Sequence, residues 1–169
     1  MISIQPERPE YYPIVFEINQ RAFGRVDEAK LVEVLRKVAH PQISLVAIRA
    51  GQVVGHIFFS PVTIEGSTSS LQALGLAPMA VMPELQHQGI GSALVRTGLD
   101  AARRIDQKVV VVLGHSEYYP RFGFAIASRK GIRYEHPVPD EAFMVLELEP
   151  GTLKGHAGVV HYLPEFSQG

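Results

Sequence analysis

The chain has 169 residues, of which 46% are hydrophobic, and this is enough apolar material for one packed core. Its 16 Lys and Arg residues nearly balance its 17 Asp and Glu residues, which excludes a broad electrostatic attraction to nucleic acids or anionic membranes. It has no cysteine, so disulfides, a thiol nucleophile and thiolate metal ligands are excluded. We therefore expect a single domain over residues 1–169 that has neither nucleic-acid nor membrane partners.

Targeting and metal-binding signals are missing as well. The N-terminal segment lacks the basic start and apolar centre of a secretory signal, and no apolar run approaches the roughly 20 residues of a membrane span. The seven histidines do not show the spacing of metal ligands, so we expect no metal. No Gly-x-Ser-x-Gly turn is present, which argues against a serine hydrolase. These observations predict a cytoplasmic protein.

Apolar periodicity and turn residues divide the first half of the chain into helices and strands. The predicted elements are a strand over 2–5, helices over 9–22 and 28–39, and strands over 43–49, 53–62 and 71–81. Asp27 stands where a helix cap is expected. Pro78 interrupts an otherwise apolar strand, and because proline cannot donate to a ladder we expect a bulge there.

The second half begins with a helical pattern that runs to Ile105. After it we predict a buried strand over 109–113, a short helix over 117–122, a partly extended stretch over about 124–133, a strand over 143–148, and a tail over 150–169 that packs on the body. Strands on either side of a crossover helix pair in parallel, so 71–81 and 109–113 should be parallel. The expected fold class is α/β, with a mixed, mostly antiparallel sheet of six or seven strands and helices on both faces.

A glycine turn lies between the strand over 71–81 and the long helix. The first N–H groups of a helix have no partner within it, and the helix dipole adds partial positive charge there. Glycines let a phosphate approach the backbone closely. The candidate donors are the N–H groups of His87, Gln88, Gly89, Ile90, Gly91 and Ser92. A single Gly-x-Gly also occurs in plain tight turns, and this one lacks the Lys-Ser/Thr of a P-loop.

Motifs around this turn resemble a known superfamily. Gln86-His87-Gln88-Gly89-Ile90-Gly91 matches the Q/R-x-x-G-x-G/A motif of the GNAT superfamily of acyl-CoA-dependent N-acyltransferases. Tyr119-Pro120-Arg121-Phe122-Gly123-Phe124 resembles the Y-x-x-x-G-F signature of the same superfamily. The resemblance is strongest over residues 71–125. It implies a single GNAT-like domain that uses acetyl-CoA as cosubstrate and needs no metal.

The resemblance also implies roles for particular residues. The backbone of Met79, Ala80 and Val81 would pair with the pantetheine arm as a neighbouring strand does, at a point where the strand separates from 109–113. Tyr119 would lie close to the thioester sulfur and protonate the leaving thiolate. Tyr118 competes for this role, but Tyr119 is the tyrosine that stands four residues before Gly123.

The general base is less well defined. Many members of the superfamily carry a glutamate on or near the strand that corresponds to 71–81, and this strand has no carboxylate. His115, Glu117 or a water held by the backbone are the alternatives. A histidine has a suitable unperturbed pKa for a base, but His115 could equally be an ordinary turn residue. No cysteine is available to carry an acyl-enzyme.

These features predict an N-acetyltransferase that moves an acetyl group from acetyl-CoA to a primary amine by direct attack in a ternary complex. The acceptor would be a small molecule or a peptide, and the sequence is compatible with a homodimer. Two alternatives remain. One is a non-catalytic module that binds or senses acyl-CoA, which the missing strand carboxylate suggests. The other is a nucleotide-phosphate binder that uses the same glycine turn.

Overall fold

The computed structural model describes residues 1–167, and the chain divides into two units. The first unit comprises Met1–Ser60, Ala77–Ala101 and the residues from Pro164 onward. The second unit comprises Pro61–Leu76 and Ala102–Leu163. The long strands β3 (Gln52–Glu65) and β4 (Ser70–Val81) therefore contribute residues to both units.

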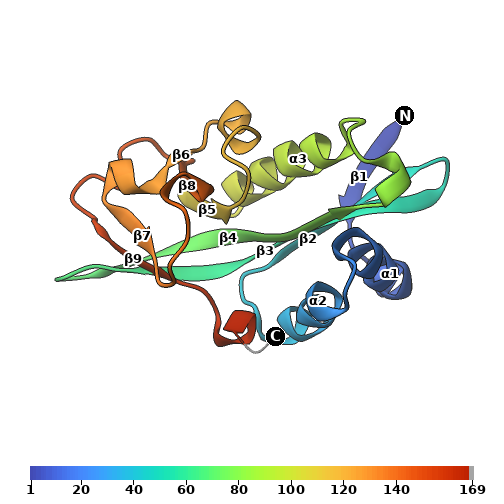
Figure 1. Ribbon diagram of the computed structural model, residues 1–169, viewed down its shortest axis with the longest axis horizontal. Helices are drawn as coiled ribbons and strands as arrows, with labels where there is room; N and C mark the ends of the chain where they lie inside the picture. Colours follow the sequence, from blue (N-terminus) through green and yellow to red (C-terminus); the bar gives the residue numbers. More distant parts are fainter. Residues whose placement is uncertain (168–169) are drawn as a thin grey trace. The chain divides into compact units, whose positions relative to one another are not determined.

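The first unit is a layered arrangement of strands and helices. Besides parts of β3 and β4, it contains β1 (Ile2–Pro6), η1 (Pro9–Tyr11), α1 (Tyr12–Phe23), α2 (Asp27–Val38), β2 (Ile43–Arg49), η2 (Pro83–Leu85), most of α3 (Ile90–Arg104) and η6 (Pro164–Ser167). β1 pairs antiparallel with β2, and β2 pairs antiparallel with β3. In Figure 1, α3 lies on one face of these strands, while α1 and α2 lie on the other. The predicted helices on both faces are thus confirmed.

Helices α1 and α2 each bury one apolar face. Val15 and Ile18 of α1 are fully buried, and in α2 the buried residues are Ala29, Val32 and Leu35, one every three positions. The predicted cap at Asp27 is wrong: Val26 is the N-cap residue, without a side-chain hydrogen bond, and Asp27 is the first helical residue. Its carboxylate still favours this end of the helix because it meets the positive end of the helix dipole.

Two glycines allow α3 to lie close to β3. A Cβ on Gly98 would overlap the ring of Phe59, and a Cβ on Gly55 would lie 3.1 Å from Leu94 Cδ1. Larger residues would force the helix away from the strands, because a packed interior leaves no room for an added methyl group. This close packing fixes the start of α3, where the glycine turn lies.

The second unit is built mainly from short strands. Besides parts of β3 and β4, it contains β5 (Val109–Leu113), η3 (Tyr119–Phe122), β6 (Ala125–Ile126), η4 (Ala127–Lys130), β7 (Ile132–Tyr134), η5 (Asp140–Ala142), β8 (Phe143–Glu147) and β9 (Gly158–His161). β4 pairs in parallel with β5, as predicted, and β8 pairs antiparallel with both β5 and β6. β9 lies between β3, to which it is antiparallel, and β7, to which it is parallel.

Residues 1–167 contain nine strands rather than the six or seven predicted. Where β6 and β7 lie, the sequence predicted only a partly extended stretch over about 124–133, and it missed β9; these three strands have 2, 3 and 4 residues. Such short strands show too little alternation to be recognised, and β9 falls inside the segment expected to be a tail. The predicted class, an α/β fold with a mixed and mostly antiparallel sheet, is confirmed.

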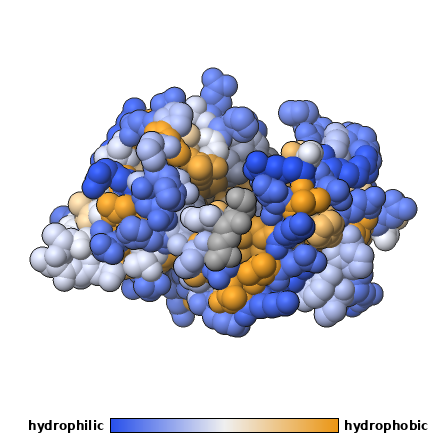
Figure 2. Space-filling model, turned by 60° about the horizontal axis from the view of Figure 1, so that its bottom comes forward, coloured by the Kyte–Doolittle hydropathy of each residue, from blue (hydrophilic) through white to orange (hydrophobic). Residues whose placement is uncertain are grey.

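The side of the first unit that carries α1 and α2 exposes some apolar surface. Val34 and Val38 of α2 are 40% and 42% exposed. Figure 2, in which this side is turned forward, shows orange apolar areas divided by blue hydrophilic ones. None of the helices within residues 1–167 combines the length and the apolar character that a membrane span needs.

A buried polar network crosses the first unit. His56 is completely buried, and its Nδ1 lies 3.4 Å from Asn19 Nδ2, while its Nε2 lies 2.9 Å from Ser44 Oγ. Ser44 Oγ donates to Glu7 Oε1, and Arg36 donates to Glu7 Oε2 at 2.7 Å. These partners suit a neutral imidazole that carries its proton on Nε2 and accepts at Nδ1. Burial is the main reason that the pKa of His56 falls from 6.5 to about 4, with an opposing effect from Glu7.

We predict that this histidine makes the fold sensitive to acid. Between about pH 6.5 and about pH 4, His56 is protonated in the unfolded chain but remains neutral in the native state. The free energy of unfolding should therefore decrease as the pH falls through this window, by up to ~3 kcal/mol. Urea titrations at a series of pH values measure the effect. The variant His56→Gln should have a flatter profile, whereas His40→Gln, at an exposed histidine, should keep the parent slope. An unchanged slope in His56→Gln would contradict the prediction.

Candidate active site

The glycine turn has the backbone geometry of an anion site. The turn that follows Val81 is closed by a hydrogen bond in which Gln86 Nε2 donates to Val81 O at 3.2 Å. His87 and Gly89 are both in the left-handed region, with φ of 66° and 87°. Such alternations let neighbouring N–H groups point into one concavity. The N–H of Ala93 donates to Gly89 O, so the N–H groups before it precede the hydrogen-bond ladder of the 15-residue α3.

Side chains from other elements hold this turn in place. Arg21 of α1 donates to Glu84 Oε2 at 2.9 Å and lies 3.3 Å from Met82 Sδ. Arg49, at the end of β2, donates to Gln88 Oε1 at 3.0 Å. These two contacts tie the segment between β4 and α3 to two different elements of the first unit.

The end of β4 provides the other predicted cofactor residues. Ala80 and Val81 are buried, whereas Met79 is half-buried. The parallel pairing of β4 with β5 ends with Gly75 opposite Val111, and β4 continues to Val81. Residues 79–81 and 87–92 all belong to the first unit, so the structure brings the predicted cofactor residues into one unit.

The predicted catalytic residues lie in the second unit, in the turn that follows β5. The carbonyl oxygen of His115 accepts from the N–H groups of Tyr118 and Tyr119, at 3.1 and 3.4 Å. The side chains of His115 and Glu117 are exposed, and neither makes a hydrogen bond or an ion pair with any of residues 1–167. Tyr119, in contrast, is only 7% exposed.

The phenol of Tyr119 is held in an aromatic setting. Its ring lies on Gly114, where a Cβ would overlap it, and meets Phe124 and Tyr118 edge-on at centroid distances of 5.7 and 5.0 Å. Burial raises the pKa of Tyr119 above its usual value of 10 because the phenolate would lose its hydration. The hydroxyl therefore carries its proton at neutral pH and can act as a donor.

A second tyrosine of the second unit has a comparable environment. The ring of Tyr162 lies on Gly75, where a Cβ would be 2.7 Å from Cε2, and it meets Tyr134 edge-on at 5.6 Å. Its N–H donates to Glu135 Oε2 at 2.9 Å. Burial is the main cause of its raised pKa, and the charges of Tyr134, Tyr119 and Glu135 act in the same direction. Tyr162 thus occupies the point at which the pairing of β4 with β5 ends.

Reasoning from the sequence missed both Tyr162 and Arg49. The run of apolar residues that leads into Tyr162 is the only local signal for it, and this run is too short to predict β9. Arg49 ends a predicted strand, and nothing in the sequence connects it with the glycine turn 39 residues later.

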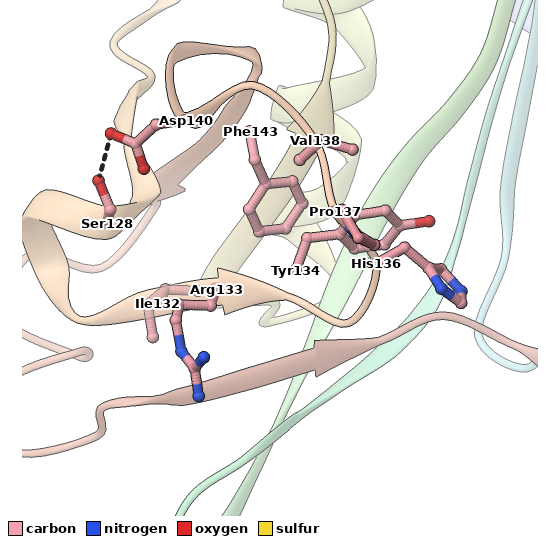
Figure 3. Close-up of a pocket in the computed structure, with 9 residues that line it drawn as sticks. All are labelled: Ser128, Ile132, Arg133, Tyr134, His136, Pro137, Val138, Asp140 and Phe143. Atoms are coloured by element: carbon pink, nitrogen blue, oxygen red, sulfur yellow. Dashed lines mark hydrogen bonds between the residues drawn. The ribbon is translucent and has the colours of Figure 1, made fainter.

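A small cavity of about 190 Å³ also lies in the second unit (Figure 3). It is lined by Ser128, Ile132, Arg133, Tyr134, His136, Pro137, Val138, Asp140 and Phe143. The rings of Tyr134 and Phe143 stack with centroids 5.2 Å apart, and Ser128 Oγ donates to Asp140 Oδ2 at 2.9 Å. The cavity therefore combines aromatic walls with one carboxylate, the guanidinium of Arg133 and the imidazole of His136.

Comparison with known proteins identifies the family. A family model described as an acetyltransferase (GNAT) domain matches residues 3–127. The chain belongs to the GNAT acetyltransferase family. This confirms the superfamily and the enzyme class that the two motifs predicted.

Relatives of similar length support the GNAT assignment. The chain is 42% identical over 148 residues to the uncharacterized N-acetyltransferase YjhQ of Escherichia coli K12, covering 83% of this chain and 82% of the relative. It is 37% identical to the uncharacterized N-acetyltransferase YhbS of the same strain, covering 98% of both chains.

Solved structures of GNAT proteins match the fold along almost the whole chain. The structure of Escherichia coli YhbS in complex with CoA has a TM-score of 0.90 at 35% identity, covering 99% of this chain and 92% of that chain. A GNAT acetyltransferase from Brucella melitensis in complex with acetyl-CoA has a TM-score of 0.80 at 33% identity, covering 98% of both chains.

Proposed function

We propose that the protein transfers the acetyl group of acetyl-CoA to a primary amine, as one N-acetyltransferase domain over residues 1–169. The observation that carries this proposal is the glycine turn with left-handed His87 and Gly89 at the start of α3. It lies in a fold for which the matched structures from Escherichia coli and Brucella melitensis were determined with CoA and acetyl-CoA. The family's description as an acetyltransferase supports the acetyl group as the group transferred.

The cofactor would be bound mainly by backbone groups. The N–H groups from His87 to Ser92 would hold the diphosphate, because these residues form the turn at the positive end of α3. The backbone of residues 79–81, which lies beyond the pairing with β5, would pair with the pantetheine arm as a strand does. A backbone N–H near Val81 would donate to the oxyanion that forms on the thioester carbonyl.

The chemistry would be a direct attack in a ternary complex. The amine nitrogen forms a bond to the thioester carbonyl carbon, the C–S bond breaks, and the sulfur receives the proton of the Tyr119 hydroxyl. The attacking amine loses a proton in the same sequence of steps. His115, Glu117 or water would accept it, and the exposure of both side chains favours a base in contact with solvent.

The acceptor is proposed to be a small-molecule or peptide amine that uses the cavity of the second unit. Gly114 N–H donates to Ala142 O at 2.9 Å, so the turn that leads to Tyr119 runs beside the segment that contributes Asp140 and Phe143. The carboxylate of Asp140 would attract an ammonium group, and the aromatic walls would pack against its carbon chain.

Turnover with acetyl-CoA against a panel of amines, peptides and aminoglycosides tests the proposal, with free thiol as the readout. We expect amine-dependent release of CoA. Calorimetric titrations with acetyl-CoA and with ATP, carried out beside the turnover assay, measure the affinity for each ligand. Binding of acetyl-CoA without turnover on any acceptor would favour a sensing module. Tighter binding of ATP than of CoA would favour a nucleotide-phosphate binder.

A further inference from the structure

Arg49 is a cation beside the glycine turn. It is the last residue of β2, its side chain is exposed, and its guanidinium Nη1 donates to Gln88 Oε1 at 3.0 Å. Gln88 stands between the two left-handed residues of the turn. β2 and β3 are paired up to this end, where Arg49 lies opposite Gln52, so the strand pairing fixes the backbone that carries the guanidinium.

The partner of Arg49 distinguishes it from other arginines of the first unit. Arg8, Arg21, Arg25 and Arg36 each form an ion pair with a glutamate. Arg49 has no ion pair with a carboxylate anywhere in residues 1–167. A neutral amide orients the guanidinium but does not neutralise it, so its full positive charge remains available to an anionic ligand.

We propose that Arg49 is a phosphate-binding residue of the acyl-CoA site. This inference rests on the proposed function. Backbone N–H groups and the helix dipole supply only partial charges, whereas a guanidinium supplies a full charge and two parallel donors that match phosphate oxygens. The phosphate that it binds belongs either to the diphosphate of the cofactor or to the 3′-phosphate of the ribose, and the two can be separated by experiment.

Calorimetric titration of the parent, Arg49→Met and Arg49→Lys with acetyl-CoA tests this assignment. We expect Arg49→Met to bind acetyl-CoA at least ~10-fold more weakly than the parent. The affinity of Arg49→Lys should lie between those of the parent and Arg49→Met, since lysine keeps the positive charge but lacks the two parallel donors of a guanidinium. The parent should also lose more affinity than Arg49→Met when the salt concentration is raised. Arg8→Met is the matched control, because Arg8 is an exposed arginine of the same unit that pairs with Glu10.

A second titration with acetyl-3′-dephospho-CoA identifies the phosphate. If Arg49 binds the 3′-phosphate, Arg49→Met and the parent should bind this analogue equally. If Arg49 binds the diphosphate, the variant should lose as much affinity for the analogue as for acetyl-CoA. Either result supports the assignment. Equal affinity of Arg49→Met and the parent for acetyl-CoA would overturn it.

The outcome for Arg49 is separable from that for the proposed function. Thermal unfolding without ligand should be nearly the same in Arg49→Met and the parent, because the side chain is exposed and its hydrogen bond to Gln88 lies at the surface, where it contributes little to stability. A parent that binds acetyl-CoA but turns over no acceptor would refute catalysis, while the binding data still decide the role of Arg49. A parent that does not bind acetyl-CoA would overturn both proposals. If Arg49→Met binds acetyl-CoA as tightly as the parent and turnover is normal, only the inference about Arg49 is overturned.

Discussion

Replacing Tyr119 by phenylalanine should lower kcat by at least ~30-fold, since general-acid catalysis typically contributes ~10²–10⁴-fold. The ring is retained, so the contacts with Gly114 and Phe124 persist and only the proton donor is lost. The dissociation constant for acetyl-CoA should therefore stay within about threefold of the parent. Steady-state kinetics with an acceptor that supports turnover, together with calorimetry, measure the two quantities.

Tyr118→Phe is the matched control for this prediction. Tyr118 is adjacent in sequence, packs edge-on against Tyr119, and is less deeply buried. Loss of its hydroxyl should have a much smaller effect on kcat. The experiment requires conditions in which the chemical step limits the rate. Full activity of Tyr119→Phe under those conditions would mean that the thiolate leaves without this acid. A large loss in Tyr118→Phe would assign the role to the neighbouring tyrosine.

Replacing Gly91 by glutamate should weaken the binding of acetyl-CoA by at least ~10-fold, or ~1.4 kcal/mol. Gly91 is the second residue of α3, in the turn where the proposed diphosphate site has its donors. The substitution adds side-chain bulk and a negative charge that would repel a phosphate. Calorimetry measures the affinity, and circular dichroism establishes that the variant is folded.

Gly151→Glu provides a control for an added glutamate. Gly151 lies in a turn of the second unit, and no other atom lies within 4 Å of a Cβ placed on it. Its φ of 87° strains any residue with a side chain, so circular dichroism must establish that this variant is folded as well. This variant carries the same change in charge away from the glycine turn, so its affinity for acetyl-CoA should match that of the parent. Parent-like affinity in a folded Gly91→Glu would remove the central support for the proposed cofactor site.

The sequence by itself determined the elements and motifs that depend on neighbouring residues. Strands β2 and β5 begin and end where the apolar runs predicted, and α3 starts at the glycine turn. These features are readable because periodicity, turn residues and helix ends are local properties of the chain. The two motifs also identified the family, since the residues of each motif lie within a few positions of one another in the sequence.

Only the tertiary structure decided which distant residues meet. It pairs β9 with β3 and β7, seats Tyr162 on Gly75, and places Arg49 against Gln88 across 39 positions of sequence. The buried partners of His56 come from other helices and strands in the same way. Such contacts leave no periodic signal in the sequence, because they arise from the packing of whole elements rather than from the conformation of adjacent residues.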